Sequence, residues 1–452
     1  MELNRIQSIF FLGAGGIGMS ALARYCLAKG MKVLGYDKTP SPITKALQNE
    51  GASIFYDDDP SMLADDIGLV VYTPAVPVST ALFKAIVNKN LPMVKRAKML
   101  GLLTKDKKTI AIAGTHGKTT ISTMVAHILK SAGVKATAFL GGISTNYSTN
   151  YLADEPSDWV VVEADEFDRS FLELEPDIAL ITAIDADHLD VYGNEEALRS
   201  SFREFAARIK SGGILIKKRG LDITPSSSVK TLQYHLHEPA DVYSKGIEVK
   251  NGTFHAGIEG LLKCQPFSFG LPGRHNIENA LGAALVADLA GVDGNTIARA
   301  LSSFLGVKRR FEQCYAENGW VVIDDYAHHP EEIRVSIEAT RELHPGKELT
   351  VVFQPHLFSR TRDLADGFAA SLGMADRLLL LDIYPARELP IEGITSEWLL
   401  DKIHLKEKHL LKKDDLPRAI ASLKPGALLV MGAGDIDRVV GGLVDTLKNI
   451  GQ

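Results

Sequence analysis

The stretch "FFLGAGGIGMSAL", residues 10–22, decides how the beginning of the chain folds. It predicts an apolar strand, a glycine-rich turn and a helix, because Gly13, Gly15 and Gly18 fit the pattern G-x-G-x-x-G. In such a unit the N–H groups of the turn and of the helix N-terminus bind a diphosphate. An acidic residue follows at the end of the next apolar run, "MKVLGYD". We therefore expect a Rossmann-like domain whose nucleotide site consists of Gly13, Gly15, Gly16, Ile17, Gly18 and Asp37.

A second glycine loop lies a hundred residues further on, in "IAIAGTHGKTTISTM", residues 110–124. Strand, loop and helix again follow one another, so the loop N–H groups point at an anion. Lys118 is expected to lie in a solvent-facing loop and to reach the phosphates of a nucleoside triphosphate. Ile112 stands where the general phosphate-loop pattern has its first glycine, and a chance match at a helix N-terminus is the alternative. The predicted ATP site consists of Gly114, Thr115, His116, Gly117, Lys118, Thr119 and Thr120.

Three side chains around this loop are candidate Mg²⁺ ligands. Thr119 supplies a hydroxyl of the kind that binds the metal of a bound nucleotide. Glu163 ends the apolar run "WVVVEAD", and His188 follows the run "DIALITAID". The carboxyl ends of parallel strands meet at one edge of a sheet, where ligands bind. A purely structural role for a strand-end Glu or His is the alternative.

Composition and patterning give the organisation of the chain. At 452 residues it is too long for one core, and strand-like runs alternate with helical patterns, which predicts α/β domains with parallel sheets. We expect three domains, at residues 1–105, 106–312 and 313–452: Rossmann-like, ATP-binding of the phosphate-loop type, and Rossmann-like again. The turn-rich runs of residues 213–270, which include "GGILIKK" and "DVYSKGIEV", are expected to form an antiparallel excursion within the central domain.

The same composition excludes several classes of function. A formal net charge of −6 gives no electrostatic footprint for nucleic acid. The three cysteines, Cys26, Cys264 and Cys314, are far apart and lack the C-x-x-C pattern, which argues against a disulfide framework and a zinc site. The chain has no uninterrupted apolar run long enough to cross a membrane. We expect a cytoplasmic protein without membrane insertion, a monomer or a homodimer.

Seven motifs in order along the chain resemble those of the Mur ligase family. They are "AGTHGKTT", "VEADEFDRSFL", "DADHLDVYG", "GRHNIENALGAA", "GVKRRFE", "DDYAHHP" and "FQPHLFSRTRDL". The resemblance implies an ATP-dependent amide ligase that joins L-alanine to the carboxylate of UDP-N-acetylmuramate through an acyl phosphate, in peptidoglycan precursor synthesis. It also implies that the first domain holds UDP, and not NAD. Lys118 and Mg²⁺ held by Thr119, Glu163 and His188 would neutralise the charge as two anions meet.

The resemblance assigns further residues. Asn276 and Asn279 would contact the adenine side of ATP, although "HNIEN" could also cap a core helix. Arg310 and Asp325 would bridge to ATP from the domain junction. L-alanine would be surrounded by Tyr326, His329, His356 and Arg360. Arg362 is an alternative partner for the amino-acid carboxylate, and the histidines could instead cap the helix after Pro330.

His356 and Arg360 are four residues apart at the start of a helical stretch, so we expect them to face the same side. The alternatives for the whole chain are a related recycling ligase that attaches a peptide to the same sugar nucleotide, an NAD-dependent dehydrogenase, and an ATP-gated switch without catalysis.

Overall fold

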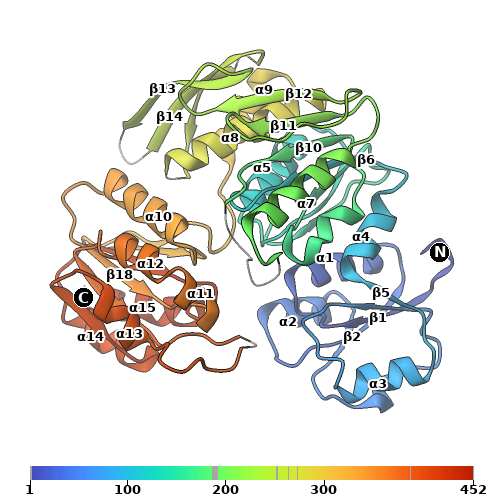
Figure 1. Ribbon diagram of the computed structural model, residues 1–452, viewed down its shortest axis with the longest axis horizontal. Coiled ribbons are helices and arrows are strands. Elements are labelled where there is room, and N and C mark those ends of the chain that lie inside the picture. The colour runs from blue at the N-terminus through green and yellow to red at the C-terminus, as the bar shows by residue number, and fades with distance from the viewer. Residues whose placement is uncertain are drawn as a thin grey trace.

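The computed structural model describes residues 3–185, 192–250, 253–262, 264–271, 273–386 and 388–450. These residues form a five-stranded, a ten-stranded and a six-stranded sheet in chain order. Figure 1 shows each sheet in a unit of its own, with the central unit above, the N-terminal unit at the lower right and the C-terminal unit at the lower left. The α/β class and the three sheet-containing units expected from the sequence are confirmed.

The first sheet carries the strand order β3-β2-β1-β4-β5, and every pair in it is parallel. Its strands are β1 (Ser8–Leu12), β2 (Lys32–Tyr36), β3 (Ser53–Phe55), β4 (Leu69–Tyr72) and β5 (Met93–Lys95). Its helices are η1 (Leu3–Arg5), α1 (Ile17–Ala28), α2 (Pro42–Asn49), η2 (Pro60–Met62), α3 (Ala81–Asn88) and α4 (Arg96–Thr104). All five residues of β1 are buried, because this strand pairs on both sides and helices cover both faces. The glycine turn thus lies at the carboxyl edge of the central strand.

The central sheet has the order β15-β14-β13-β12-β11-β10-β6-β9-β7-β8. Its strands are β6 (Lys108–Ala113), β7 (Ala136–Phe139), β8 (Tyr151–Leu152), β9 (Trp159–Glu163), β10 (Ile178–Ile181), β11 (Ile214–Lys218), β12 (Lys230–His235), β13 (Val242–Lys250), β14 (Thr253–Gly260) and β15 (Cys264–Phe269). Its helices are α5 (Lys118–Ser131), η3 (Phe167–Glu173), α7 (Glu195–Ala207), α8 (Arg274–Leu289) and α9 (Gly294–Ser303).

The expected antiparallel excursion begins later than the sequence suggested. Strand β11, the run "GGILIKK", is parallel to β10, and β12 is parallel to both β11 and β13. Among the described residues of this stretch, only β13, β14 and β15 pair antiparallel. Strand β11 returns to the sheet through the helix α7, so it enters as one more parallel strand.

The third sheet has the order β16-β17-β21-β18-β19-β20 and is parallel except for β16. Its strands are β16 (Glu312–Tyr315), β17 (Val321–Asp325), β18 (Leu349–Phe353), β19 (Arg377–Leu380), β20 (Glu407–Leu410) and β21 (Ala427–Met431). Its helices are α10 (Pro330–Leu343), α11 (Phe358–Asp363), α12 (Ala365–Leu372), α13 (Ser396–Lys402), η4 (Lys413–Asp415), α14 (Leu416–Ala421) and α15 (Asp437–Ile450).

The sheets place the motif residues at strand ends. Loops after β6, β9 and β10 meet at the carboxyl edge of the central sheet, and the segments after β17 and β18 do the same in the third sheet. Figure 1 shows helix α10 below helix α8, at the junction of the two units. Within the part of the chain described, no helix has the length and apolar character needed to cross a membrane.

Candidate functional site

The phosphate loop joins β6 to α5 and is packed tightly on both sides. Gly114 and Gly117 have φ angles of 125° and 80°, a backbone conformation that favours glycine. A Cβ atom on Gly114 would lie 2.0 Å from Thr182 Oγ1, and one on Gly117 would lie 2.7 Å from Asn279 Oδ1. The Thr182 hydroxyl donates to the His116 carbonyl, which ties the loop to the end of β10. Side chains from the end of β10 and from α8 therefore pack directly against the two glycines of the loop.

Lys118 is the first residue of α5 and is not solvent-facing, so this expectation from the sequence is wrong. Its side chain is 13% exposed, and its Nζ lies 2.7 Å from the Gly114 carbonyl oxygen and 2.9 Å from Glu166 Oε2. Burial opposes the charged form, but the carboxylates of Glu166, Asp165 and Glu163 outweigh it and raise the pKa of Lys118. The lysine is a preformed cation beneath the phosphate loop.

Glu163 ends β9 and faces the loop from the neighbouring strand. A Cβ atom on Gly141 would lie 2.1 Å from Glu163 Oε2, so the carboxylate fills the space that this glycine leaves. That oxygen is buried and has no hydrogen-bond partner among the residues described. Burial raises the pKa of Glu163, against the influence of Lys118 and of a hydrogen bond from Thr119.

A hydroxyl and an orphaned carboxylate oxygen side by side fit Mg²⁺, which takes oxygen ligands and keeps several waters. The described residues contain no group of three His, Cys, Asp or Glu side chains that could hold a metal. The remaining ligands of such an ion would be nucleotide oxygens and water. The third expected ligand, His188, lies outside the described residues.

The two asparagines of α8 sit beside the phosphate loop. Asn276 is buried, and Asn279 Nδ2 donates to Asn276 Oδ1 at 3.2 Å. The alternative that "HNIEN" caps the helix is wrong, because the N-cap residue is Gly273 and no side chain caps it. Since the Asn279 amide borders Gly117, both amides remain candidates for contact with a bound nucleotide.

Arg310 and Asp325 occupy the junction between the central and third units. The Arg310 guanidinium lies over the Tyr326 ring, 4.9 Å from its centre. Asp325 ends β17 and accepts from the Phe311 N–H at 3.3 Å and from the Ser336 hydroxyl. Burial raises the pKa of this carboxyl, while the hydrogen bond from Ser336 lowers it. The pair thus joins the connecting segment to α10.

The candidate amino-acid residues come from two segments of the third unit. His329 caps α10, with its Nδ1 accepting from the Glu331 N–H at 3.3 Å, and its ring centre lies 5.4 Å from that of His116. His329 therefore both caps α10 and lies next to His116 of the phosphate loop. His356 stacks on Tyr384 with ring centres 5.8 Å apart. Burial, followed by the charges of His328 and Arg360, lowers the pKa of His356 to about 4, so the ring is neutral at pH 7.

His356 and Arg360 do not share a helix, so their expected helical spacing is wrong. Helix α11 begins at Phe358, after Leu357 with a φ of 71°, and contains Arg360 but not His356. Arg362 is half exposed and pairs with its neighbour Asp363 at 2.7 Å. Arg360 is less exposed than Arg362, so we keep Arg360 as the candidate for an amino-acid carboxylate.

A cavity of about 790 Å³ runs from the glycine turn of the first unit to the carboxyl edge of the central sheet. All six residues predicted for the sugar nucleotide line it, and so do Glu163, Asp165 and Arg438. Asp37 accepts from the Gly15 N–H at 2.8 Å, which fixes the carboxylate against the turn. Arg96 Nη2 lies 3.4 Å from Asp165 Oδ2 across the boundary of the two units. One continuous space therefore connects the diphosphate turn with the candidate metal site.

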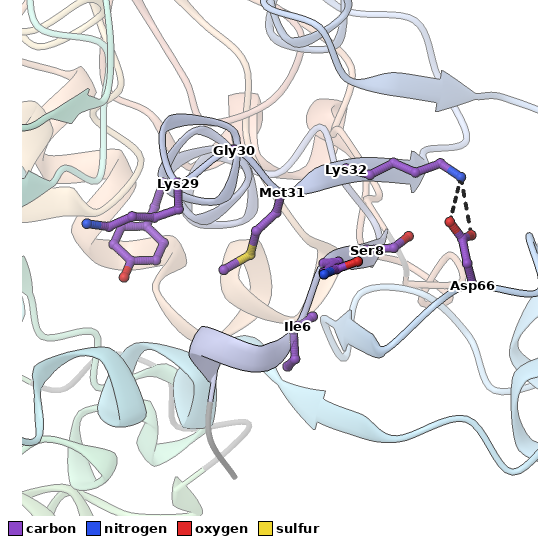
Figure 2. Close-up of a pocket in the computed structure, with 9 residues that line it drawn as sticks. Ile6, Ser8, Lys29, Gly30, Met31, Lys32 and Asp66 are labelled. Carbon is purple, nitrogen blue, oxygen red and sulfur yellow. Dashed lines mark hydrogen bonds and ion pairs between the residues drawn. The ribbon is translucent and has the colours of Figure 1, made fainter.

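A second cavity, of about 630 Å³, lies at the opposite end of the first sheet. Figure 2 shows Ser8 and Lys32 at the amino ends of β1 and β2, and Lys32 paired with Asp66. None of the predicted site residues lines this cavity. Ligands of parallel α/β sheets bind at the carboxyl ends of the strands, which favours the larger cavity as the functional site.

Comparison with known proteins decides the family. Residues 8–108 match the model described as "Mur ligase family, catalytic domain", residues 112–287 match "Mur ligase middle domain", and residues 309–434 match "Mur ligase, glutamate ligase domain". UDP-N-acetylmuramate–L-alanine ligases of Parabacteroides distasonis and Christiangramia forsetii are each 46% identical to the chain, with 97% of both sequences covered. This chain belongs to the Mur ligase family. A solved UDP-N-acetylmuramate–alanine ligase of Thermotoga maritima is 28% identical, with a TM-score of 0.84 over 98% of this chain and 99% of that one.

This Mur ligase has site neighbours that sequence reasoning did not single out. Asp165 and Glu166 lie two and three positions after Glu163 in "VEADE", so their place in that motif was an available signal. Glu332 is the third residue of α10 and forms a capping box with His329, so the sequence pattern explains it as a helix cap. Its contact with His116 is visible only in the structure. Arg438 reaches the large cavity from α15, and only the three-dimensional fold brings it there.

Proposed function

We propose that this Mur ligase joins the amino group of L-alanine to the carboxylate of UDP-N-acetylmuramate with hydrolysis of ATP, in peptidoglycan precursor synthesis. The observation that carries the proposal is the cavity that links the glycine turn to Glu163 beside the phosphate loop. It lets a sugar nucleotide held at Gly13–Gly18 extend its far end to the γ-phosphate. The relatives that share 46% identity support L-alanine as the amino acid.

The reaction proceeds in two steps, phosphorylation of the carboxylate and formation of the amide. A carboxylate oxygen of the sugar nucleotide attacks the γ-phosphorus of ATP, the bond to the bridging oxygen breaks, and ADP leaves. The uncharged amine of L-alanine then attacks the carbonyl carbon of the acyl phosphate. Phosphate leaves with the bonding electrons, and the nitrogen loses a proton to give the amide.

Charge is the barrier that the site has to lower, because the carboxylate and the γ-phosphate are both anionic. Lys118 is buried as a cation next to the loop, where a fixed charge stabilises the transition state more than it would in water. Bound Mg²⁺, for which we propose Thr119, Glu163 and His188 as ligands, supplies a second positive charge on the phosphates. We assign the N–H groups of residues 116–119 to the phosphate oxygens, since the Thr115 N–H donates to the Ala183 carbonyl.

The third unit supplies the amine. We assign Arg360 to the carboxylate of L-alanine, where a guanidinium offers a bidentate pair of donors. We assign Tyr326, His329 and the neutral His356 to the same amino-acid site, and Asn276, Asn279, Arg310 and Asp325 to ATP. With its carboxylate held by Arg360, L-alanine would keep its amine free to attack the acyl phosphate.

The test is phosphate release by the full chain with ATP, Mg²⁺ and UDP-N-acetylmuramate, with L-alanine, glycine, L-serine or a tripeptide as the acceptor. We expect L-alanine to give the highest kcat/KM, with phosphate and amide formed in equal amounts. Omitting the amino acid should reduce phosphate release to a small fraction. Preference for the tripeptide would instead identify a recycling ligase. If the rate of phosphate release were the same with and without every acceptor, the protein would be a nucleotide switch.

A further inference from the structure

His116 connects the phosphate loop to the third unit. Its Nδ1 lies 3.1 Å from Oε1 of Glu332, the third residue of α10, and the two residues are 216 positions apart in the chain. Its Nε2 lies 3.4 Å from Oδ2 of Asp185, which follows β10. The His116 ring is 20% exposed, so both contacts lie in a largely desolvated place. The loop that would hold ATP is thus tied to the unit that would hold the amino acid.

The other oxygen of Glu332 holds the segment that carries the candidate amino-acid residues. Glu332 Oε2 accepts from the His328 N–H at 3.0 Å and from the His329 N–H at 3.3 Å. The Nδ1 atom of the His328 ring lies 3.3 Å from the same Glu332 oxygen. The side chain is 18% exposed. One carboxylate therefore fixes the phosphate loop with one oxygen and residues 328–329 with the other.

We propose that Glu332 is a positioning residue: by holding His116 and the His328–His329 backbone together, it sets the amino-acid segment against ATP in the phosphate loop. The proposal rests on the proposed function for the identity of the two ligands. Glu332 needs no contact with substrate for this role. Its effect on the reaction comes from fixing the distance between the phosphate loop and residues 328–329.

The charges around His116 favour this contact. Burial works against a charged ring, but Asp185 and Glu332 outweigh it and raise the pKa of His116 to about 10. Glu331 adds a further negative charge from α10, and the ring of His329 faces His116 from the residue before that helix. Lys118, two positions along the loop, is engaged by Glu166. The ring is a cation at neutral pH, and both of its N–H groups are donors.

The test compares Glu332→Gln with Glu338→Gln in the full chain. Gln keeps the size of Glu332 but loses the charge that binds His116, whereas Glu338 lies on the exposed face of the same helix and pairs with Arg334. Loss of a charged hydrogen bond predicts a KM for L-alanine at least roughly tenfold higher in E332Q, with the KM for ATP changed less than about threefold. E338Q should match the wild type.

Two further readouts separate positioning from general damage. His116→Asn removes the same contact from the other side, so the double variant H116N/E332Q should be no worse than the poorer single variant. The ratio of the E332Q KM to the wild-type KM should fall towards one as the pH rises from 7 towards 10, because His116 then loses its charge. Effects that multiply in the double variant, or an E332Q enzyme that matches E338Q, would overturn the proposal.

Small-angle scattering tests the contact without the reaction. The radius of gyration of E332Q and of H116N should exceed that of the wild type and of E338Q, because the third unit is released from the loop. If the wild type does not ligate L-alanine, the proposed function fails and the scattering still decides on the contact. If the wild type ligates L-alanine but all four proteins scatter alike, the positioning role of Glu332 is wrong.

Discussion

Replacing Lys118 by alanine should have two separable effects, because the structure pairs this lysine with a buried carboxylate. The Nζ–Oε2 distance to Glu166 is 2.9 Å, and the two side chains are 13% and 0% exposed. Removing one partner of a buried ion pair costs about 3–5 kcal/mol of stability, because the other charge stays in the interior. Removing a preorganised cation from the site should also cost about 3 kcal/mol or more of transition-state stabilisation, roughly a hundredfold in kcat.

The double variant Lys118→Ala/Glu166→Gln distinguishes these effects. Neutralising Glu166 removes the buried negative charge that Lys118 balances, so the thermal unfolding midpoint should recover part of what the single variant loses. Activity should stay lost, because the cation at the phosphates is still missing. The assay is phosphate release with saturating ATP, UDP-N-acetylmuramate and L-alanine, together with a thermal melt of each protein. A single variant that keeps more than about a tenth of the wild-type kcat would refute the assignment of Lys118. A double variant that melts no higher than the single one would refute the argument that Lys118 balances the buried charge of Glu166.

Three other perturbations test separate parts of the site. Arg360→Ala should raise the KM for L-alanine roughly ten- to a hundredfold and leave the KM for ATP nearly unchanged, while Arg360→Lys recovers only part of the loss; a rise in the ATP KM alone would move Arg360 to the nucleotide site. Calorimetry of the whole protein should show tighter binding of UDP-N-acetylmuramate than of NAD, and the reverse order would revive a dehydrogenase. Gly141→Ala places a Cβ 2.1 Å from Glu163 Oε2 and should lower kcat at least roughly tenfold by displacing that carboxylate; an unchanged kcat would mean that the position of Glu163 is unimportant.

Local sequence signals were sufficient for the features that local chemistry determines. The glycine turn at residues 13–18 and the phosphate loop at 114–117 follow buried strands, so their place at the carboxyl edge of a sheet could be predicted. Glu163 could be assigned to the same edge, because it ends the strand beside β6. These predictions need only the strand–turn–helix pattern and the parallel arrangement of the sheets.

Contacts between distant segments could not be predicted in this way. Lys118 and Glu166 are 48 positions apart, and His116 and Glu332 are 216 apart, so only tertiary packing brings each pair together. His356 lies before the helix of Arg360, because Leu357 has a positive φ and the helix begins only at Phe358. No residue type in that segment predicts this conformation. Strand β11 joins the sheet parallel to β10, although its turn-rich surroundings are equally typical of an antiparallel ribbon.

The central claim is that ATP activates the carboxylate of the sugar nucleotide inside the cavity that links the first two units. Labelling both carboxylate oxygens of UDP-N-acetylmuramate with oxygen-18 tests it directly. When the amine displaces phosphate from an acyl phosphate, one of the former carboxylate oxygens leaves with the phosphorus. After ligation of L-alanine, mass spectrometry should find one heavy oxygen in the released phosphate and one in the amide product. Phosphate without the label would contradict the claim, because the carboxylate would then never have been phosphorylated.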